Sequence, residues 1–144
     1  MFYFRYPAKF TRGADGRVLV EFIDFPRAAT DGKDIREAMA EAEDCLGSVI
    51  SFAIVDKEDI PPPSPLRRGL RPVNVPLYLA PKLALYLALR DAGISRNELA
   101  RRLGVPETAV RRLLDPKHDL KPERIQAALA TLGKHVCVAM EDAA

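Results

Sequence analysis

The chain has 144 residues, 48% of them hydrophobic, and a formal net charge of +2, which suits one ordinary domain or two small ones. It contains no run of about eighteen apolar residues, so no membrane span is predicted, and its start lacks the pattern of a signal peptide. Its two cysteines, Cys45 and Cys137, lie far apart. A disulfide framework or structural zinc site is therefore not expected, and a reducing cytoplasm is the predicted compartment.

The charge is distributed unevenly along the chain. Residues 1–66 hold eight Lys/Arg and twelve Asp/Glu, whereas residues 67–144 hold fourteen and eight. The basic half would suit a polyanion. The acidic half would suit a basic protein, although for that half taken alone a solvated surface is the better explanation.

The first part of the chain has the alternating pattern of β-strands. Residues 2–11 and 17–25 alternate apolar and polar side chains around Asp15-Gly16, which predicts a hairpin. Residues 28–30 predict a short third strand, and Asp31-Gly32 a turn. Apolar residues then recur at helical spacing after Asp34, whose capping box with Glu37 predicts a long helix. The side chains expected on its apolar face are Ile35, Ala38, Met39, Ala42, Cys45, Leu46, Val49, Phe52 and Ala53.

A proline-rich stretch, residues 60–65, ends this helix and predicts a stiff loop. A last strand is expected within residues 71–79. Pro72 and Pro76 have no N–H to donate, so this strand should lie at a sheet edge. The predicted order is strand, strand, strand, helix, strand.

The order and spacing of several short motifs in this half resemble the HicB antitoxin family. The motifs are Tyr6-Pro7-Ala8, Asp15-Gly16, Asp24, Pro26, Thr30-Asp31-Gly32 and Glu37-Ala38. The resemblance implies a partial ribonuclease-H-like fold and a cognate HicA-like toxin, a small basic ribonuclease. One departure is Pro26-Arg27-Ala28, where family members often have Pro-Gly-Cys.

Catalysis by this half is not predicted. Ribonuclease-H chemistry needs several carboxylates converging on Mg²⁺, and only Asp24, near a strand end, is well placed to mimic one. Glu21, Asp31 and Asp34 do not complete the set at these spacings. The sequence therefore predicts a protein that is not an enzyme, without cofactor or metal.

Residues 95–114 have the pattern of a helix-turn-helix. Ser95 and Glu98 form a capping box, Gly104 suits a turn with positive φ, and Val105 is expected in the core. Pro106 is expected in the first turn of the second helix. Flanking helices are predicted over 81–93 and 122–133, an order that resembles the Cro/repressor domain. Residues 135–140 predict either a closing strand or a loose tail.

The second helix of this motif is the predicted recognition helix, which in such domains enters the major groove. The expected DNA base contacts are Glu107, Thr108, Arg111 and Arg112. The expected phosphate contacts are Arg96, Lys117 and Lys121, the two lysines being explained equally well as solvated surface charges.

Together these patterns predict an α+β protein with a DNA-binding domain at 79–144, and the resemblance to the HicB family implies a toxin-neutralising domain at 1–78. The predicted function is that of a cytoplasmic antitoxin that sequesters a HicA-like ribonuclease and binds operator DNA of its own operon as a homodimer, with a tetramer left open. The alternative is a helix-turn-helix repressor whose first domain senses a small molecule.

Overall fold

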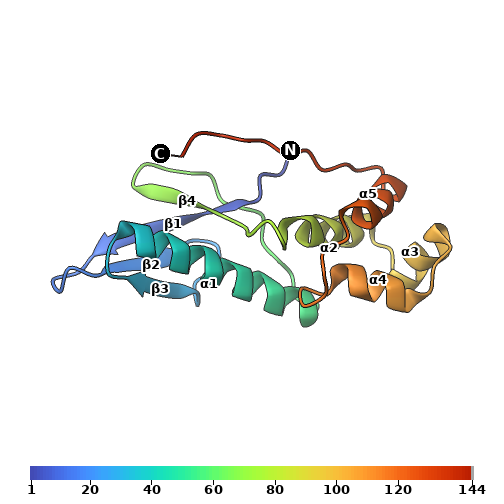
Figure 1. Cartoon of the computed structure of the whole chain (residues 1–144), viewed down its shortest axis with the longest axis horizontal. Coiled ribbons are helices and arrows are strands. Elements are labelled where there is room, and N and C mark those ends of the chain that lie inside the picture. Colours follow the sequence, from blue (N-terminus) through green and yellow to red (C-terminus); the bar gives the residue numbers. More distant parts are fainter. Residues whose placement is uncertain (144) are drawn as a thin grey trace. The chain divides into compact units, whose positions relative to one another are not determined.

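The computed structural model describes residues 1–143, which divide into two compact units, 1–80 and 81–143 (Figure 1). The first unit contains four strands and a long helix, and the second contains helices. The predicted α+β class and the predicted order of elements are confirmed. Within residues 1–143, none of the helices combines the length and the apolarity needed to cross a membrane.

The first unit is an antiparallel sheet covered by one helix. Its strands are β1 (Arg5–Arg12), β2 (Val18–Phe22), β3 (Ala29–Gly32) and β4 (Leu70–Asn74), in the order β3-β2-β1-β4. Helix α1 (Ile35–Val55) packs against the sheet. In β2, Val18, Val20 and Phe22 are buried and alternate with exposed residues, as the sequence predicts.

Strand β4 lies at the sheet edge and pairs only with β1, which confirms the expectation from its prolines. Pro72 stands opposite Pro7 in the ladder. The predicted turn at Asp31-Gly32 is wrong, because both residues belong to β3 and Asp31 pairs with Leu19. Gly32 is needed there for close packing rather than for a turn, since a Cβ at this position would lie 2.3 Å from the backbone nitrogen of Ala38.

Helix α1 begins at the predicted cap, where Asp34 Oδ1 accepts a 2.9 Å hydrogen bond from the Glu37 N–H. Glu37 reaches back to the N–H of Lys33 at 2.5 Å, one residue before the position that a capping box would use. The sequence predicted Phe52 on the buried face of this helix. That prediction is wrong, because the side chain is 70% exposed. Each helical residue turns by about 100°, so Phe52 lies about 200° from both Ile50 and Ile54, which are buried, and points away from the sheet. The buried residues are Ala38, Ala42, Leu46, Gly47, Ile50, Ala53 and Ile54.

The second unit contains α2 (Ala80–Ala92), α3 (Arg96–Leu103), α4 (Glu107–Leu114) and α5 (Pro122–Thr131), in the predicted order. Each helix contributes apolar side chains to one core. These are Leu83, Leu85, Leu89, Leu99, Ala100, Val110, Leu113, Leu114, Ile125, Ala128 and Leu129. Residues 134–143 form neither helix nor strand, so of the two readings of the tail the closing strand is wrong.

The division at Ala80 changes the distribution of charge. The first unit includes Arg67, Arg68 and Arg71 and so holds eleven Lys/Arg and twelve Asp/Glu, against eleven and eight in residues 81–144. The units therefore differ less in charge than the two halves of the sequence. The acidity of the first unit is concentrated around α1, since residues 34–59 contain eight Asp/Glu and two Lys/Arg.

Candidate nucleic-acid interface

Helices α3 and α4 are joined by a short turn. The Ser95 hydroxyl caps α3 by accepting a 3.0 Å hydrogen bond from the Glu98 N–H. Gly104 ends α3 in the left-handed conformation, with φ of 68°. The Val105 N–H then donates to the Ala100 carbonyl at 3.0 Å. This geometry is that of a helix-turn-helix, as the sequence predicts.

Two details of the turn differ from the expectation. Val105 is 38% exposed and does not fill the core. Pro106, with ψ of 152°, is the extended residue before α4 rather than part of its first turn. Both differences have one cause: α4 begins at Glu107, which leaves 104–106 as an exposed connection.

Helix α4 separates apolar and polar side chains sharply. Val110, Leu113 and Leu114 are buried. Thr108, Arg111 and Arg112 are exposed, and Glu107 is half-buried. The four side chains predicted to contact bases therefore lie off the buried face of one helix, as readout from a major groove requires.

Carboxylates hold several of the arginines on these two helices. Arg111 Nη2 lies 2.7 Å from Glu107 Oε2, one helical turn away. Glu98 accepts hydrogen bonds from Arg101 at 2.7 and 2.9 Å and from Arg102 at 3.0 Å. These hydrogen bonds from Arg101 and Arg102 lower the pKa of Glu98 to about 2. The pairs are exposed, so they orient side chains more than they stabilise the fold.

Four of the cations predicted to contact DNA have no ion-pair partner within residues 1–143. Arg112 is exposed on α4, and Arg96 is the first residue of α3, where the helix N-terminus also favours an anion. Lys117 and Lys121 are exposed within the loop between α4 and α5. These four are therefore available to phosphates or bases without breaking an internal ion pair.

Arg124, which the sequence patterns did not predict as a DNA contact, lies beside Lys121. The two residues and their neighbours Pro122 and Glu123 line a shallow depression of about 230 Å³ at the start of α5. The signal was present in the sequence, because Arg124 lies three residues after Lys121. Spacing alone did not distinguish this arginine from an ordinary solvated charge on a helix surface.

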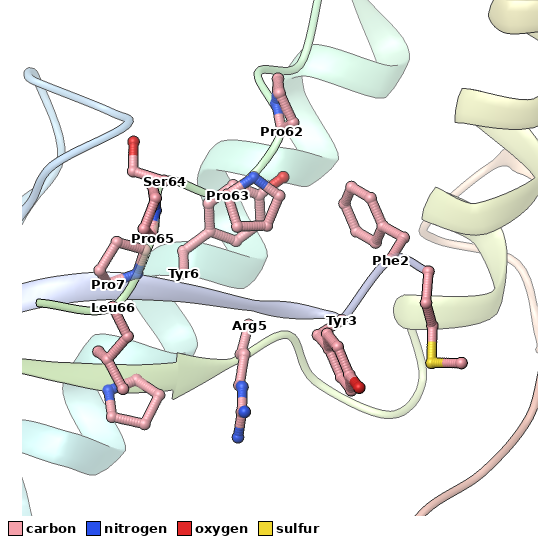
Figure 2. A pocket seen from close by; sticks show the side chains of 12 residues that line it. Phe2, Tyr3, Arg5, Tyr6, Pro7, Pro62, Pro63, Ser64, Pro65 and Leu66 are labelled. Atoms are coloured by element: carbon pink, nitrogen blue, oxygen red, sulfur yellow. The ribbon is translucent and has the colours of Figure 1, made fainter.

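The first unit has a cleft of about 340 Å³ beside the proline-rich segment. Figure 2 shows Pro62, Pro63, Ser64 and Pro65 running alongside the start of β1, with Phe2, Tyr3 and Arg5 along the same cleft. The segment is fastened to the sheet because the Tyr6 hydroxyl donates to the Pro61 carbonyl at 2.8 Å. Burial raises the pKa of Tyr6, so this hydroxyl stays protonated as a donor.

Asp24, the carboxylate considered for metal-dependent cleavage, also fastens this segment. One of its oxygens accepts a hydrogen bond of 2.9 Å from the Ser64 N–H, and the other accepts one from the Ser64 hydroxyl. Across residues 1–143, no three His, Cys, Asp or Glu side chains come together in a way that would hold a metal ion. The structure therefore gives Asp24 a role in holding the loop.

Comparison with known proteins first defines the class of each part. Residues 87–123, which contain the helix-turn-helix, match the CENP-B N-terminal DNA-binding domain. Residues 5–84 match the family described as the HicB_like antitoxin of bacterial toxin-antitoxin system. The class is thus an antitoxin with a DNA-binding domain appended to it.

The chain belongs to the HicB-like antitoxin family, and its relatives match along nearly their whole length. It is 38% identical over 136 residues to Antitoxin HicB of Escherichia coli strain K12, which covers 94% of this chain and 99% of that protein. Antitoxin HicB 2 of Photorhabdus laumondii is 36% identical, covering 92% and 93%. Antitoxin HicB of Pseudomonas fluorescens is 32% identical, covering 89% and 88%. The predicted family resemblance is confirmed.

Proposed function

We propose that this protein neutralises a small HicA-like ribonuclease toxin through its first unit and represses its own operon through its second. One observation carries the proposal. A chain of an antitoxin family also contains a helix-turn-helix, and Thr108, Arg111 and Arg112 are exposed on its second helix. An antitoxin that only covered its toxin would need no such face. The site of action is the cytoplasm, where toxin and operator are found.

For DNA, the proposed contacts follow from the geometry of α3 and α4. Arg112 and Arg111 are suited to the O6 and N7 atoms of guanine, Glu107 to the N4 amino group of cytosine, and Thr108 to a base or a thymine methyl. Arg96 would contact phosphate together with the first N–H groups of α3. Lys117 and Lys121 would add phosphate contacts from the following loop. In a homodimer, two α4 helices would lie about 34–36 Å apart on a near-palindromic site.

For the toxin, the acidic helix α1 is the best-supported surface of the first unit. Glu41 and Asp44 are exposed and have no ion-pair partner in the described part of the chain, and Phe52 and Val55 are 70% and 56% exposed on the same helix. Exposed carboxylates and an exposed aromatic side chain on one helix suit a basic protein, because the charges speed docking and the aromatic ring supplies affinity.

The test combines toxicity and DNA binding. The small open reading frame adjacent to the gene would be expressed alone and then with this protein, and the complex would be purified. Growth arrest that coexpression relieves, together with a stoichiometric complex, is the expected result for the toxin half. For the DNA half, the full chain should bind the region upstream of its gene more tightly than a scrambled duplex of the same composition. If the product of the adjacent reading frame is harmless and does not bind this protein, the proposed toxin neutralisation is overturned, while the proposed DNA binding is unaffected.

One observation favours a second candidate, a repressor that senses a small molecule. The cleft beside Pro62–Pro65 is lined mainly by apolar side chains and by Arg5, as many ligand pockets are. In that case, a metabolite would release the protein from DNA, and the neighbouring reading frame would encode no toxin. Release of DNA by a small molecule, together with an adjacent reading frame whose product does not arrest growth, would distinguish this candidate from the antitoxin.

A further inference from the structure

Lys82 is the one charged residue in the described part of the chain whose side chain is fully buried, at 1% exposure. It is the third residue of α2, and its ammonium group donates hydrogen bonds to two backbone carbonyls more than thirty residues away. These are the carbonyls of Asp115, at 2.6 Å, and of His118. Burial of a charge costs free energy unless the charge is paired or hydrogen-bonded, and here the two carbonyls supply the hydrogen bonds.

The ammonium group of Lys82 lies in an unfavourable electrostatic position with respect to α2 and a favourable one with respect to α4. A cation in the first turn of α2 is disfavoured by the dipole of that helix. The same cation lies at the C-terminal end of α4, where Asp115 is the cap and the dipole favours positive charge. Burial lowers the pKa of Lys82, and the carboxylates of Asp115 and Asp119 oppose that shift.

The two carbonyls belong to the loop that ends the recognition helix. The Asp115 N–H donates to the Arg111 carbonyl at 3.0 Å, and the His118 N–H donates to the Asp115 carbonyl at 3.1 Å. Asp115 Oδ1 accepts from the Lys117 N–H at 2.9 Å. One ammonium group thus bonds both ends of a four-residue loop, which carries Lys117 and follows directly from the helix with Arg111 and Arg112.

We propose that Lys82 is a positioning residue for DNA recognition: from α2 it fixes the C-terminal end of α4 and the loop 115–118, and so sets where the base-reading side chains lie. This inference rests on the proposed DNA binding. Lys82 itself touches no DNA. Its loss should therefore impair base readout, which depends on the angle of α4, more than attraction to phosphates, which depends mainly on charge.

The first test needs no DNA and separates this proposal from the proposed function. Hydrogen exchange would be measured on the full chain for Lys82→Met, which keeps the length of the side chain but donates no hydrogen bond. The amides of Asp115, Lys117 and His118 should exchange at least about tenfold faster than in the wild type, with α3 and α5 unchanged. Leu89→Val is the matched control, since it alters a buried side chain two turns farther along α2. Equal protection of the loop in Lys82→Met and wild type would overturn the proposal.

The second test measures specificity. The affinity of each variant would be measured for the upstream duplex and for a scrambled duplex, at a temperature where the variant is folded by circular dichroism. For Lys82→Met we expect the specific affinity to fall about tenfold or more and the non-specific affinity by less than about twofold. Lys82→Arg, which keeps cationic donors, should recover most of the wild-type ratio of specific to non-specific affinity. If the Met variant does not fold, Lys82→Gln, whose shorter amide cannot reach both carbonyls, takes its place.

Each outcome of the second test has a defined meaning. A specificity ratio unchanged in a folded Lys82→Met protein, or an equal loss in Leu89→Val, would show that Lys82 serves the fold alone and would overturn the proposal. A wild-type protein that does not distinguish the two duplexes would overturn the proposed DNA recognition, while the exchange result would still report whether Lys82 holds the loop.

Discussion

Glu107 and Arg111 form a 2.7 Å ion pair one turn apart along the recognition helix. The pair holds the Arg111 guanidinium along α4 and cancels its charge locally. Replacing the carboxylate in Glu107→Gln should release Arg111 toward phosphates. Non-specific DNA affinity should rise, the salt dependence should steepen by about one unit, and discrimination at one base pair should fall by about 1–3 kcal/mol. Fluorescence anisotropy with operator and scrambled duplexes over a salt series measures all three.

The control for this change is Asp142→Asn, which alters the net charge equally in the exposed tail. It should raise affinity slightly on every duplex without changing discrimination. If Glu107→Gln behaves in the same way, Glu107 does not take part in base reading.

Arg112 is the exposed arginine of α4 that has no ion-pair partner in the described residues, which makes it the strongest candidate for reading a guanine. Arg112→Ala should cost about 1–3 kcal/mol of operator binding and relax the preference at one position, and the double change with Arg111→Ala should abolish operator preference while the fold survives. Competition with duplexes substituted one base pair at a time identifies the position. Arg101→Ala, at an arginine held by Glu98, should leave the preference intact. Sequence-specific binding by the double variant would disprove the assignment of α4.

Arg96 lies at the start of α3, where the cation and the free N–H groups of the helix favour a phosphate. Arg96→Ala should weaken binding to all duplexes alike and flatten the salt dependence by about one unit. The measurement is the slope of log affinity against log salt on two unrelated sequences. A loss confined to the operator would assign Arg96 to a base instead.

Glu98 has a pKa of about 2 in the folded protein because Arg101 and Arg102 donate hydrogen bonds to it, against an ordinary value of 4.5. A carboxyl whose pKa is depressed on folding contributes stability above its unfolded value and loses that contribution as the pH falls through the folded value. The free energies of unfolding of wild type and Glu98→Gln should therefore differ by a constant amount above pH 5 and converge toward pH 2. Urea titrations across this range measure the difference. A constant difference down to pH 2 would argue against these hydrogen bonds.

Phe52 is 70% exposed on the acidic helix α1, so its removal should leave the free protein intact. Phe52→Ser should change the free energy of unfolding by no more than about 0.5 kcal/mol. If α1 docks the toxin, the same change should weaken the complex by about 2 kcal/mol, or roughly thirtyfold. Calorimetry with the purified partner measures the affinity. Leu19→Ser, at a 42% exposed side chain on β2, is the control expected to bind normally, and wild-type affinity in Phe52→Ser would place the toxin elsewhere.

Much of the candidate interface was predictable because it is encoded by residues close together in the chain. The Ser95 cap, the left-handed Gly104 and the spacing of Val110, Leu113 and Leu114 each depend on neighbours within about one turn of helix. The edge position of β4 was likewise predictable from Pro72, since the reason is a missing N–H in that residue itself.

The expectations that proved wrong depend on where distant segments pack. Phe52 fits an apolar stripe in the sequence, yet the direction in which α1 meets the sheet leaves it outside. Asp31-Gly32 is typical of a turn, yet pairing with β2 and the approach of Ala38 keep it extended. For Asp24 the sequence predicted no catalytic role but gave no other, because the Ser64 N–H and hydroxyl that its two oxygens bind lie 40 positions away.

The sequence alone determined the family, the α+β class and the helix-turn-helix, because periodicity, caps and turn residues act over a few positions. The tertiary structure alone decided that Lys82 is buried against the Asp115 and His118 carbonyls and that Asp24 holds the Ser64 loop. Those contacts join residues more than thirty positions apart, so nothing in their local sequence marks them. Their energies depend on burial and on the direction of a hydrogen bond, which exist only once the chain has folded.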